Sequence, residues 1–195
     1  MVNNPKFIIF TGPMFGGKTT RLLSEVERYR YQKKSILAYK PNIDDRYDNE
    51  SIVTHNGFKL KAKKISNARE IYSDIKNWEM FKWHKEQPTI VVDESFMIKE
   101  SGLILPHLYR SGYTILTSTL QLSASCAPFE EVMQMLPWAT KIEKCPAVCT
   151  ICGRDAFYTY RKVDDLDEIA VGGSELYEPR CWDHHPNFSS IEIKI

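Results

Sequence analysis

The chain has 195 residues, of which 43% are hydrophobic and 26% are charged, and its net charge is +1. These values are ordinary for a core domain with a small appendage, and they provide no strong electrostatic attraction to nucleic acid or to a membrane surface. No apolar run approaches the length of a membrane-spanning helix and no signal peptide is evident, so we expect a cytoplasmic protein without a membrane partner.

Short apolar strands alternate with amphipathic segments along the first three quarters of the chain. Asn67 is the predicted N-cap of one helix, whereas Pro106 must bend or begin another. This alternation predicts an α/β fold with a mostly parallel sheet and helices on both faces. The predicted strands are residues 6–10, 35–39, 89–93, 113–117 and 140–144, and the predicted helices are 67–78, 103–109, 129–136 and a segment containing Leu22, Leu23, Val26 and Tyr29.

The segment TGPMFGGKTT at residues 11–20 joins the first predicted strand to the first predicted helix. It fits the phosphate-loop pattern, in which small residues turn backbone N–H groups toward one anion, a lysine neutralises phosphate oxygens and a hydroxyl ligates Mg²⁺. The alternative is a glycine turn with a chance lysine, and the flanking strand and helix disfavour it. The predicted ATP-binding residues are Gly12, Pro13, Met14, Phe15, Gly16, Gly17, Lys18, Thr19 and Thr20.

An acidic pair follows the buried run Thr-Ile-Val-Val at residues 89–92. Asp93 fits a carboxylate that holds the Mg²⁺ of a phosphate-loop protein through water. Glu94 lies one residue further, where it could accept a proton from an attacking hydroxyl. Taken alone, the pair could equally well be polar residues at the end of a strand with no function. Beside a phosphate loop, this interpretation is weaker than the functional one.

The cysteine spacing predicts a metal site. Five cysteines are an odd number and suit a disulfide framework poorly. The pairs Cys149/Cys152 and Cys181/His184 each enclose two residues, and together they would offer three thiolates and one imidazole to one tetrahedral ion, which suits a structural zinc. A redox dithiol at the first pair is the alternative, and His185 is an alternative fourth ligand.

A change of sequence character near residue 144 predicts two parts. Residues 1–144 would form the phosphate-loop domain that binds ATP, and residues 145–195 a zinc-binding domain. Residues 153–180 would then form an excursion whose base is pinned by the metal. The tail 190–195 alternates like an edge strand.

Taken together, these motifs resemble the type II thymidine kinases, a family of cytosolic, bacterial and poxviral enzymes. The similar segments are the phosphate loop, Lys40 to Tyr47 with Thr54-His55 after it, and the two metal-binding pairs with VGGSELYEPR before the second. The resemblance implies ATP-dependent phosphorylation of the 5′-hydroxyl of thymidine, with Glu94 as the catalytic base. It also implies a lasso between the metal-binding pairs that closes over the nucleoside, a homotetramer, and inhibition by thymidine triphosphate.

Further site residues come from the same resemblance. Asp44 and Arg46 match a pair near the phosphates. Met97 stands where an aromatic residue normally flanks the base. The other positions that match the nucleoside-binding pocket are Met14, Leu120, Phe129, Thr159, Val171, Gly172 and Tyr177.

The chain departs from the family pattern near the nucleoside. One interpretation is drift, because Met97 can fill the volume of an aromatic residue and Phe96 could turn into the site. The other is a pocket enlarged at Ala124, which would admit a bulkier pyrimidine or mark lost activity. The substituted positions are Phe96, Met97, Ile98, Gln121, Ala124, Cys126, Leu176 and Trp182.

Thymidine phosphorylation is therefore the leading hypothesis, and three others remain. The same reaction could use deoxyuridine or a modified pyrimidine nucleoside, or the chain could bind nucleotides without turnover. A phosphate-loop ATPase whose zinc ribbon binds nucleic acid is the fourth. The near-neutral charge and the lack of a basic, aromatic-rich stretch argue against it, so we expect no nucleic-acid partner.

Overall fold

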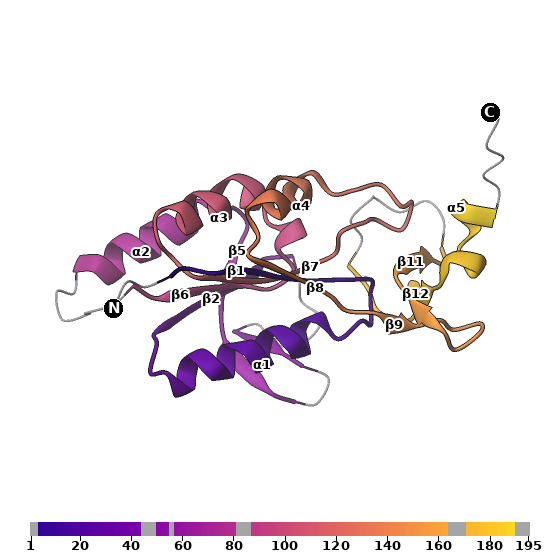
Figure 1. The fold of residues 1–195 in the computed structure, drawn as a ribbon, viewed down its shortest axis with the longest axis horizontal. Coiled ribbons are helices and arrows are strands. Elements are labelled where there is room, and N and C mark those ends of the chain that lie inside the picture. Colours follow the sequence, from indigo (N-terminus) through magenta and orange to yellow (C-terminus); the bar gives the residue numbers. More distant parts are fainter. Residues whose placement is uncertain (1–3, 44–49, 55–56, 81–86, 164–170, 190–195) are drawn as a thin grey trace.

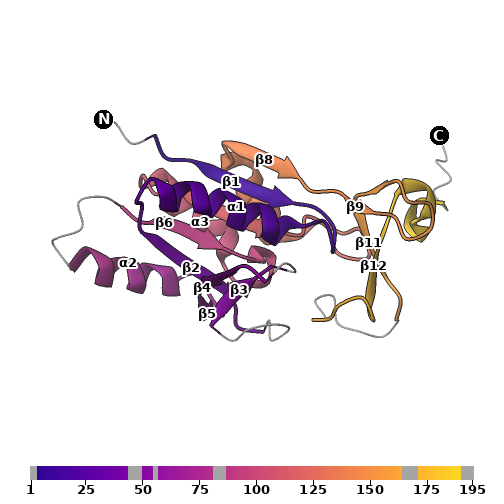
Figure 2. The same cartoon turned by 90° about the horizontal axis from the view of Figure 1, so that it is seen from below.

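The computed structural model describes residues 4–43, 50–54, 57–80, 87–163 and 171–189. Its centre is a six-stranded sheet in the order β5-β2-β6-β7-β1-β8, and all neighbouring strands in it are parallel (Figures 1 and 2). The strands are β1 (Phe7–Thr11), β2 (Ile36–Pro41), β5 (Lys63–Ile65), β6 (Thr89–Val92), β7 (Ile115–Thr119) and β8 (Lys141–Lys144).

Helices cover both faces of this sheet, as predicted. In Figure 1 the helix that follows β1 lies on one face of the sheet, here called the first face, and the helices that follow β5, β6 and β7 lie on the other, the second face. Within β1, Ile8 and Phe10 pack in the cluster on the first face, whereas Phe7 and Ile9 pack in the cluster on the second. Strands buried on both faces are continuously apolar, which is why the central strands could be predicted. The helices are α1 (Lys18–Tyr31) on the first face, and α2 (Glu70–Met80), α3 (Ser101–Arg110) and α4 (Glu130–Met135) on the second.

Several boundaries differ from the prediction for local reasons. Strand β7 begins two residues late, because the Tyr113 N–H donates to the Leu108 carbonyl and closes the end of α3. Helix α3 begins at Ser101 and contains Pro106 in its interior, so the proline does not begin it. The predicted cap is present: the Asn67 side chain accepts the N–H of Arg69 at 2.8 Å, one turn before α2.

The hairpin of β3 (Ser51–Val53) and β4 (Lys59–Lys61) was not predicted, nor was strand β5. Each has only three residues, and β4 and β5 carry two lysines each. Segments this short present no readable periodicity. The hairpin lies on the same face as α1, where Ile52 and Leu60 join the core cluster of that face.

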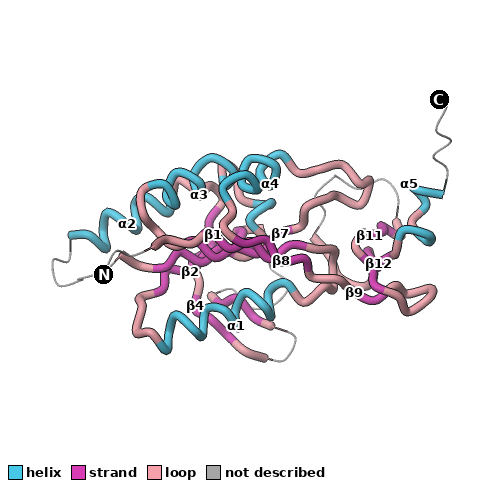
Figure 3. The backbone as a smooth tube through the Cα atoms, in the orientation of Figure 1, coloured by secondary structure: helices cyan, strands magenta, loops and turns pink. Residues whose placement is uncertain are grey.

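After β8 the chain forms two small antiparallel pairs at the end of the sheet where β1 leads into α1 (Figures 1 and 3). A 3-10 turn, η3 (Trp182–His184), precedes the last helix. The paired elements and the helix are β9 (Ala147–Val148) with β10 (Asp155–Ala156), β11 (Tyr158–Arg161) with β12 (Tyr177–Arg180), and α5 (Pro186–Ser189).

Within the described residues, every helix is too short or too polar to cross a bilayer. The predicted tail strand at 190–195 lies outside the described residues, as do Asp44, Arg46 and His55.

Candidate active site

The phosphate loop connects β1 to α1 and passes tightly against the chain that leaves β8. A Cβ atom on Gly12 would lie 2.2 Å from the carbonyl oxygen of Cys145, and one on Gly16 would lie 2.3 Å from the same atom. Gly17 has φ +70°, a left-handed conformation that glycine adopts at little cost. The glycines are therefore required by a close backbone contact and by a turn, which matches the compact cradle of a phosphate loop.

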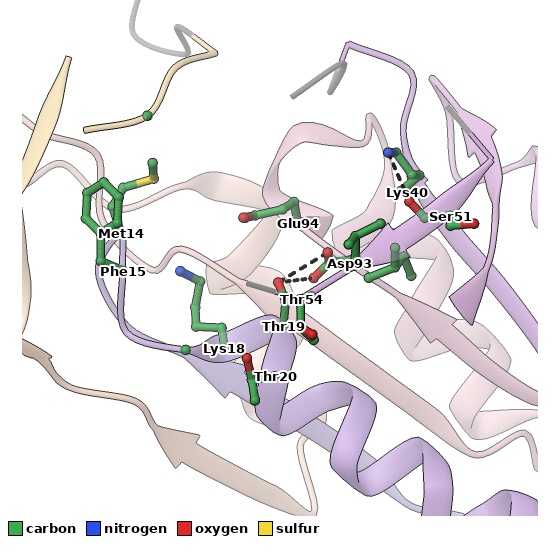
Figure 4. A pocket seen from close by; sticks show the side chains of 14 residues that line it. Met14, Phe15, Lys18, Thr19, Thr20, Lys40, Ser51, Thr54, Asp93 and Glu94 are labelled. Atoms are coloured by element: carbon green, nitrogen blue, oxygen red, sulfur yellow. Dashed lines mark hydrogen bonds between the residues drawn. The ribbon is translucent and has the colours of Figure 1, made fainter. Parts of the chain in front are cut away.

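The N-terminus of α1 is suited to an anion. Its first turn contains no acidic residue, and no side chain caps it. Uncapped N–H groups and the helix dipole together favour negative charge at this end. Lys18 begins the helix with a side chain that is only 5% exposed, and its Nζ donates to the Pro13 carbonyl at 2.8 Å. The ammonium group is thus held over the loop, where it faces the cavity (Figure 4).

Asp93 lies beside Thr19, as a shared magnesium site requires. The Thr19 hydroxyl donates to the two carboxylate oxygens of Asp93 at 3.1 and 3.3 Å, and the Ser118 hydroxyl at the end of β7 also donates to it. Burial and the adjacent charge of Glu94 raise the pKa of Asp93 to about 6, although these hydrogen bonds oppose the rise. A hydroxyl and a buried carboxylate are oxygen ligands of the kind Mg²⁺ prefers, so the donor set fits that ion.

Glu94 follows in a strained position. Its φ of +50° is unusual for a residue with a side chain, and its N–H donates to the Ser118 hydroxyl at 3.2 Å. The side chain is 8% exposed and extends into the same space as the Lys18 ammonium (Figure 4). The turn at Glu94 therefore directs its carboxylate into the cavity beside the loop, and away from the strand axis.

The cavity has a wall that the sequence did not reveal. Besides the loop, Asp93 and Glu94, its lining includes Lys40 at the end of β2, Ser51 to Thr54 around β3, and Gly173. Lys40 is 4% exposed, and its Nζ donates to the Ser51 carbonyl at 3.3 Å, which ties the hairpin to the sheet. Lys40 and Thr54 lie in segments that resemble the family, and this resemblance could have indicated that they belong to the site. Nothing in the sequence of Ser51 to Val53 indicated a place in the cavity wall.

The four predicted zinc ligands come together near the C-terminus. One ligand atom from each of Cys149, Cys152, Cys181 and His184 lies within 4.8 Å of the others. The Cys152 and Cys181 sulfurs are 3.6 Å apart, and the His184 Nδ1 lies 3.2 Å from the Cys181 sulfur. Zinc–sulfur bonds of about 2.3 Å in a tetrahedron place two sulfurs roughly 3.8 Å apart, so the cluster fits a zinc ion.

The surroundings of Cys149 and Cys152 favour their thiolates, whereas burial raises the pKa of the Cys181 thiol. Burial opposes ionisation of Cys149, yet backbone N–H groups of Cys181, Cys152 and Ile151 lower the pKa of its thiol to about 5. Arg154 donates to the Cys152 sulfur at 3.3 Å and pairs with Asp183 at 2.5 Å. A site with three thiolates and Zn²⁺ would carry one net negative charge, and the Arg154 guanidinium, itself paired with Asp183, lies beside it.

A protein-family model described as thymidine kinase matches residues 6–185. The match spans the phosphate loop, the acidic pair and all four cluster residues. The chain belongs to the thymidine kinase family. Membership implies a kinase that acts on a nucleoside, with ATP as the phosphoryl donor.

In this thymidine kinase family member, the residues matched to the nucleoside pocket lie in two groups. Leu120 and Phe129 are buried in one core cluster, and Met14 and Met97 pack against that cluster. The second group belongs to the C-terminal strands: Thr159 is buried on β11 and Tyr177 on β12, whereas Val171 and Gly172 are half-buried in the segment before β12. The Met14 N–H donates to the Thr159 hydroxyl at 3.0 Å and links the groups.

The positions that depart from the family pattern have defined places. Phe96 lies in the turn η1 (Ser95–Met97), is 5% exposed, and packs on Phe129 with ring centroids 4.7 Å apart. The Gln121 amide bonds to Lys144, and Trp182 stacks on Phe188 at 4.2 Å. Phe96 thus contacts one residue that is matched to the base pocket, whereas Trp182 belongs to the aromatic cluster beside the zinc ligands.

Proposed function

We propose that this protein transfers the γ-phosphoryl group of ATP to the 5′-hydroxyl of thymidine. One observation carries the proposal. A phosphate loop with Lys18, the Thr19–Asp93 pair and the Glu94 carboxylate all border one cavity, in a chain of the thymidine kinase family. A general base beside a phosphate-binding cradle is the arrangement that transfer to a hydroxyl requires.

Each residue has a role that follows from its chemistry. Lys18 and the N–H groups at the start of α1 would bind phosphate oxygens, and Thr19 with Asp93 would hold Mg²⁺. Bound ATP and Mg²⁺ supply the transferable phosphoryl group and the charge neutralisation. Glu94 would accept the proton of the nucleoside hydroxyl, and its 8% exposure keeps the carboxylate away from bulk water.

The zinc cluster would have a structural role. The four residues would fill all four positions of a tetrahedral ion, which would leave none for substrate. We propose that the metal fixes the small C-terminal domain, residues 145–195, against the phosphate-loop domain, residues 1–144. Thr159, Val171, Gly172 and Tyr177 would then approach the base, with Met14, Met97, Leu120 and Phe129 on the other side.

A shifted acceptor is the second candidate. The replacements at Met97 and Ala124 favour it. Met97 stands where an aromatic residue normally flanks the base, and it packs against the cluster that contains Leu120 and Phe129. Deoxyuridine or a modified pyrimidine deoxynucleoside would be the preferred substrate in that case.

The test is phosphoryl transfer from γ-labelled ATP with Mg²⁺ to a panel of deoxynucleosides, with Glu94→Gln as the matched variant. We expect labelled thymidine monophosphate from the wild type, and a loss of at least a hundredfold in kcat for the variant, since one positioned base contributes about 10²–10⁴. Product from another pyrimidine alone would identify the shifted acceptor. ATP binding without any product would indicate a nucleotide-binding relative, and ATPase activity stimulated by DNA would indicate the ATPase.

We also propose a homotetramer, on the family resemblance alone. Light scattering coupled to size-exclusion chromatography measures it directly. A mass of one 22.7 kDa chain would contradict the proposal.

A further inference from the structure

His185 follows the zinc-cluster residue His184, but its side chain belongs to another part of the structure. It is 1% exposed, and its Nε2 lies 3.2 Å from the carbonyl oxygen of Thr159 in β11. A carbonyl oxygen can only accept, so Nε2 carries the proton and Nδ1 is an acceptor. The Asn187 N–H lies 3.4 Å from Nδ1 and agrees with this tautomer.

The Thr159 carbonyl needs such a donor because, among the residues that the structure describes, β11 pairs with β12 alone. The Lys162 N–H bonds to the Leu176 carbonyl, and Thr159 lies opposite Pro179. In an antiparallel pair the bonded positions alternate, so the Thr159 carbonyl faces away from β12. The His185 side chain thus donates to a carbonyl oxygen that a neighbouring strand could otherwise bond, in a residue that is only 5% exposed.

The same threonine also holds the phosphate loop. Its hydroxyl accepts the N–H of Met14 at 3.0 Å. The next residue, Phe15, has φ +64°, a left-handed conformation that costs free energy in a residue with a side chain. Such a conformation persists where neighbouring contacts define it, and the bond from Met14 to Thr159 is one of those contacts.

The imidazole itself is held on several sides. Its ring lies 5.9 Å from the Tyr158 ring and 5.3 Å from the Phe188 ring, measured between centroids. The Cys126 sulfur, in the loop between Leu120 and Phe129, lies 3.7 Å from Nδ1. His185 therefore contacts the zinc-binding segment, β11 and the loop that carries two residues matched to the base pocket.

We propose that His185 is a positioning residue of the nucleotide site: through Thr159 it holds the Met14–Phe15 turn of the phosphate loop, and so couples the zinc-binding segment to that loop. Only the kinetic part of this inference rests on the proposed function. The structural part is a chain of two hydrogen bonds, from Nε2 of His185 to Thr159 and from Met14 to Thr159.

The test compares three variants in the zinc-loaded, full-length protein. His185→Phe keeps a ring of similar size and removes the donor, whereas His185→Gln keeps a donor of similar reach. His107→Phe makes the same chemical change on α3, at an exposed residue. The measurements are hydrogen exchange at the Met14 amide by mass spectrometry, zinc content per chain, and KM and kcat for the nucleoside.

For His185→Phe we expect about tenfold faster exchange at Met14, the change that follows loss of one ordinary hydrogen bond, with zinc still at one per chain. The nucleoside KM should rise by a similar factor, because Met14 and Thr159 are both pocket residues. His185→Gln should restore both values to within about twofold of the wild type, and His107→Phe should change neither.

Unchanged exchange in a folded, zinc-loaded His185→Phe protein would overturn the proposal. Loss of zinc in that variant would also overturn it, since His185 would then act on the metal site itself. If His185→Phe does not fold, His185→Asn replaces it, because the shorter side chain cannot reach the carbonyl. Absence of kinase activity in the wild type would refute the proposed function and leave the exchange measurement valid.

Discussion

The substitution Asp93→Asn measures how much the buried Asp93 carboxylate lowers the stability of the folded protein when no Mg²⁺ is bound. Burial, followed by the charge of Glu94, raises the pKa of Asp93 from 3.8 to about 6. A carboxyl group with a raised pKa binds its proton more tightly in the folded state than in the unfolded state. The folded protein therefore loses stability as the pH rises from about 4 through about 6.

The difference between the two pKa values corresponds to about 3 kcal/mol of unfolding free energy at pH 7, and to roughly half of that at pH 5. Asparagine retains the shape and can still accept from Ser118 and Thr19, but it carries no charge. We expect metal-free Asp93→Asn to be more stable than the wild type by about 1–3 kcal/mol at pH 7, and by about half as much at pH 5.

Urea unfolding followed by tryptophan fluorescence measures this difference in zinc-loaded protein and Mg²⁺-free buffer. Chelators are omitted, because they would remove zinc. Asp155→Asn, at an exposed position on β10, is the control and should change stability by less than about 0.5 kcal/mol. Equal or lower stability of Asp93→Asn at pH 7, or a gain that does not shrink at pH 5, would refute the reasoning.

Three other changes should have distinct effects. Gly16→Ala should destabilise the protein by more than about 2 kcal/mol in urea and abolish ATP binding, because its Cβ meets a backbone carbonyl at 2.3 Å. Gly153→Ala, with φ +73° and open space, should cost only about 1 kcal/mol, and equal costs would contradict the contact. Cys149→Ser should reduce zinc, measured by mass spectrometry, from one per chain to nearly none, and retained zinc would contradict the ligand assignment. Glu131→Gln should lower stability by about 1–2 kcal/mol, because this carboxylate accepts two N–H groups at the start of α3. Glu130→Gln, on the exposed side of α4, is its control, and equal effects would argue against the cap.

Much of the core fold followed from patterns a few residues long. The continuous apolar runs at Phe7–Phe10 and Thr89–Val92 predicted buried strands, and Leu22, Leu23 and Val26 predicted the buried face of α1. The strand order could not be read from these patterns, because nothing local distinguishes one buried parallel strand from another. The pairing of β1 with both β7 and β8 is a property of the packed sheet.

The candidate site likewise combines features that the sequence predicted with features that only the structure showed. Residue types and spacing identified Lys18, Thr19, Asp93 and Glu94 as candidates, because the chemistry of phosphate and magnesium requires those groups in that context. Spacing likewise identified the four cluster residues, but the choice between His184 and His185 depended on which imidazole lies beside the sulfurs. Two adjacent histidines look alike in a sequence.

Local sequence determined where the longer central strands, the helices that cover the sheet, the phosphate loop and the metal-binding pairs lie, because each depends on residues within one or two turns of chain. Tertiary structure alone decided that the Cys145 carbonyl requires Gly12 and Gly16 to lack side chains, and that Ser51 to Val53 border the cavity. It also decided that the Met14 amide bonds to Thr159, 145 residues away. Such contacts join segments whose separation along the chain has no periodicity, and only the packing of the sheet and the C-terminal strands brings them together.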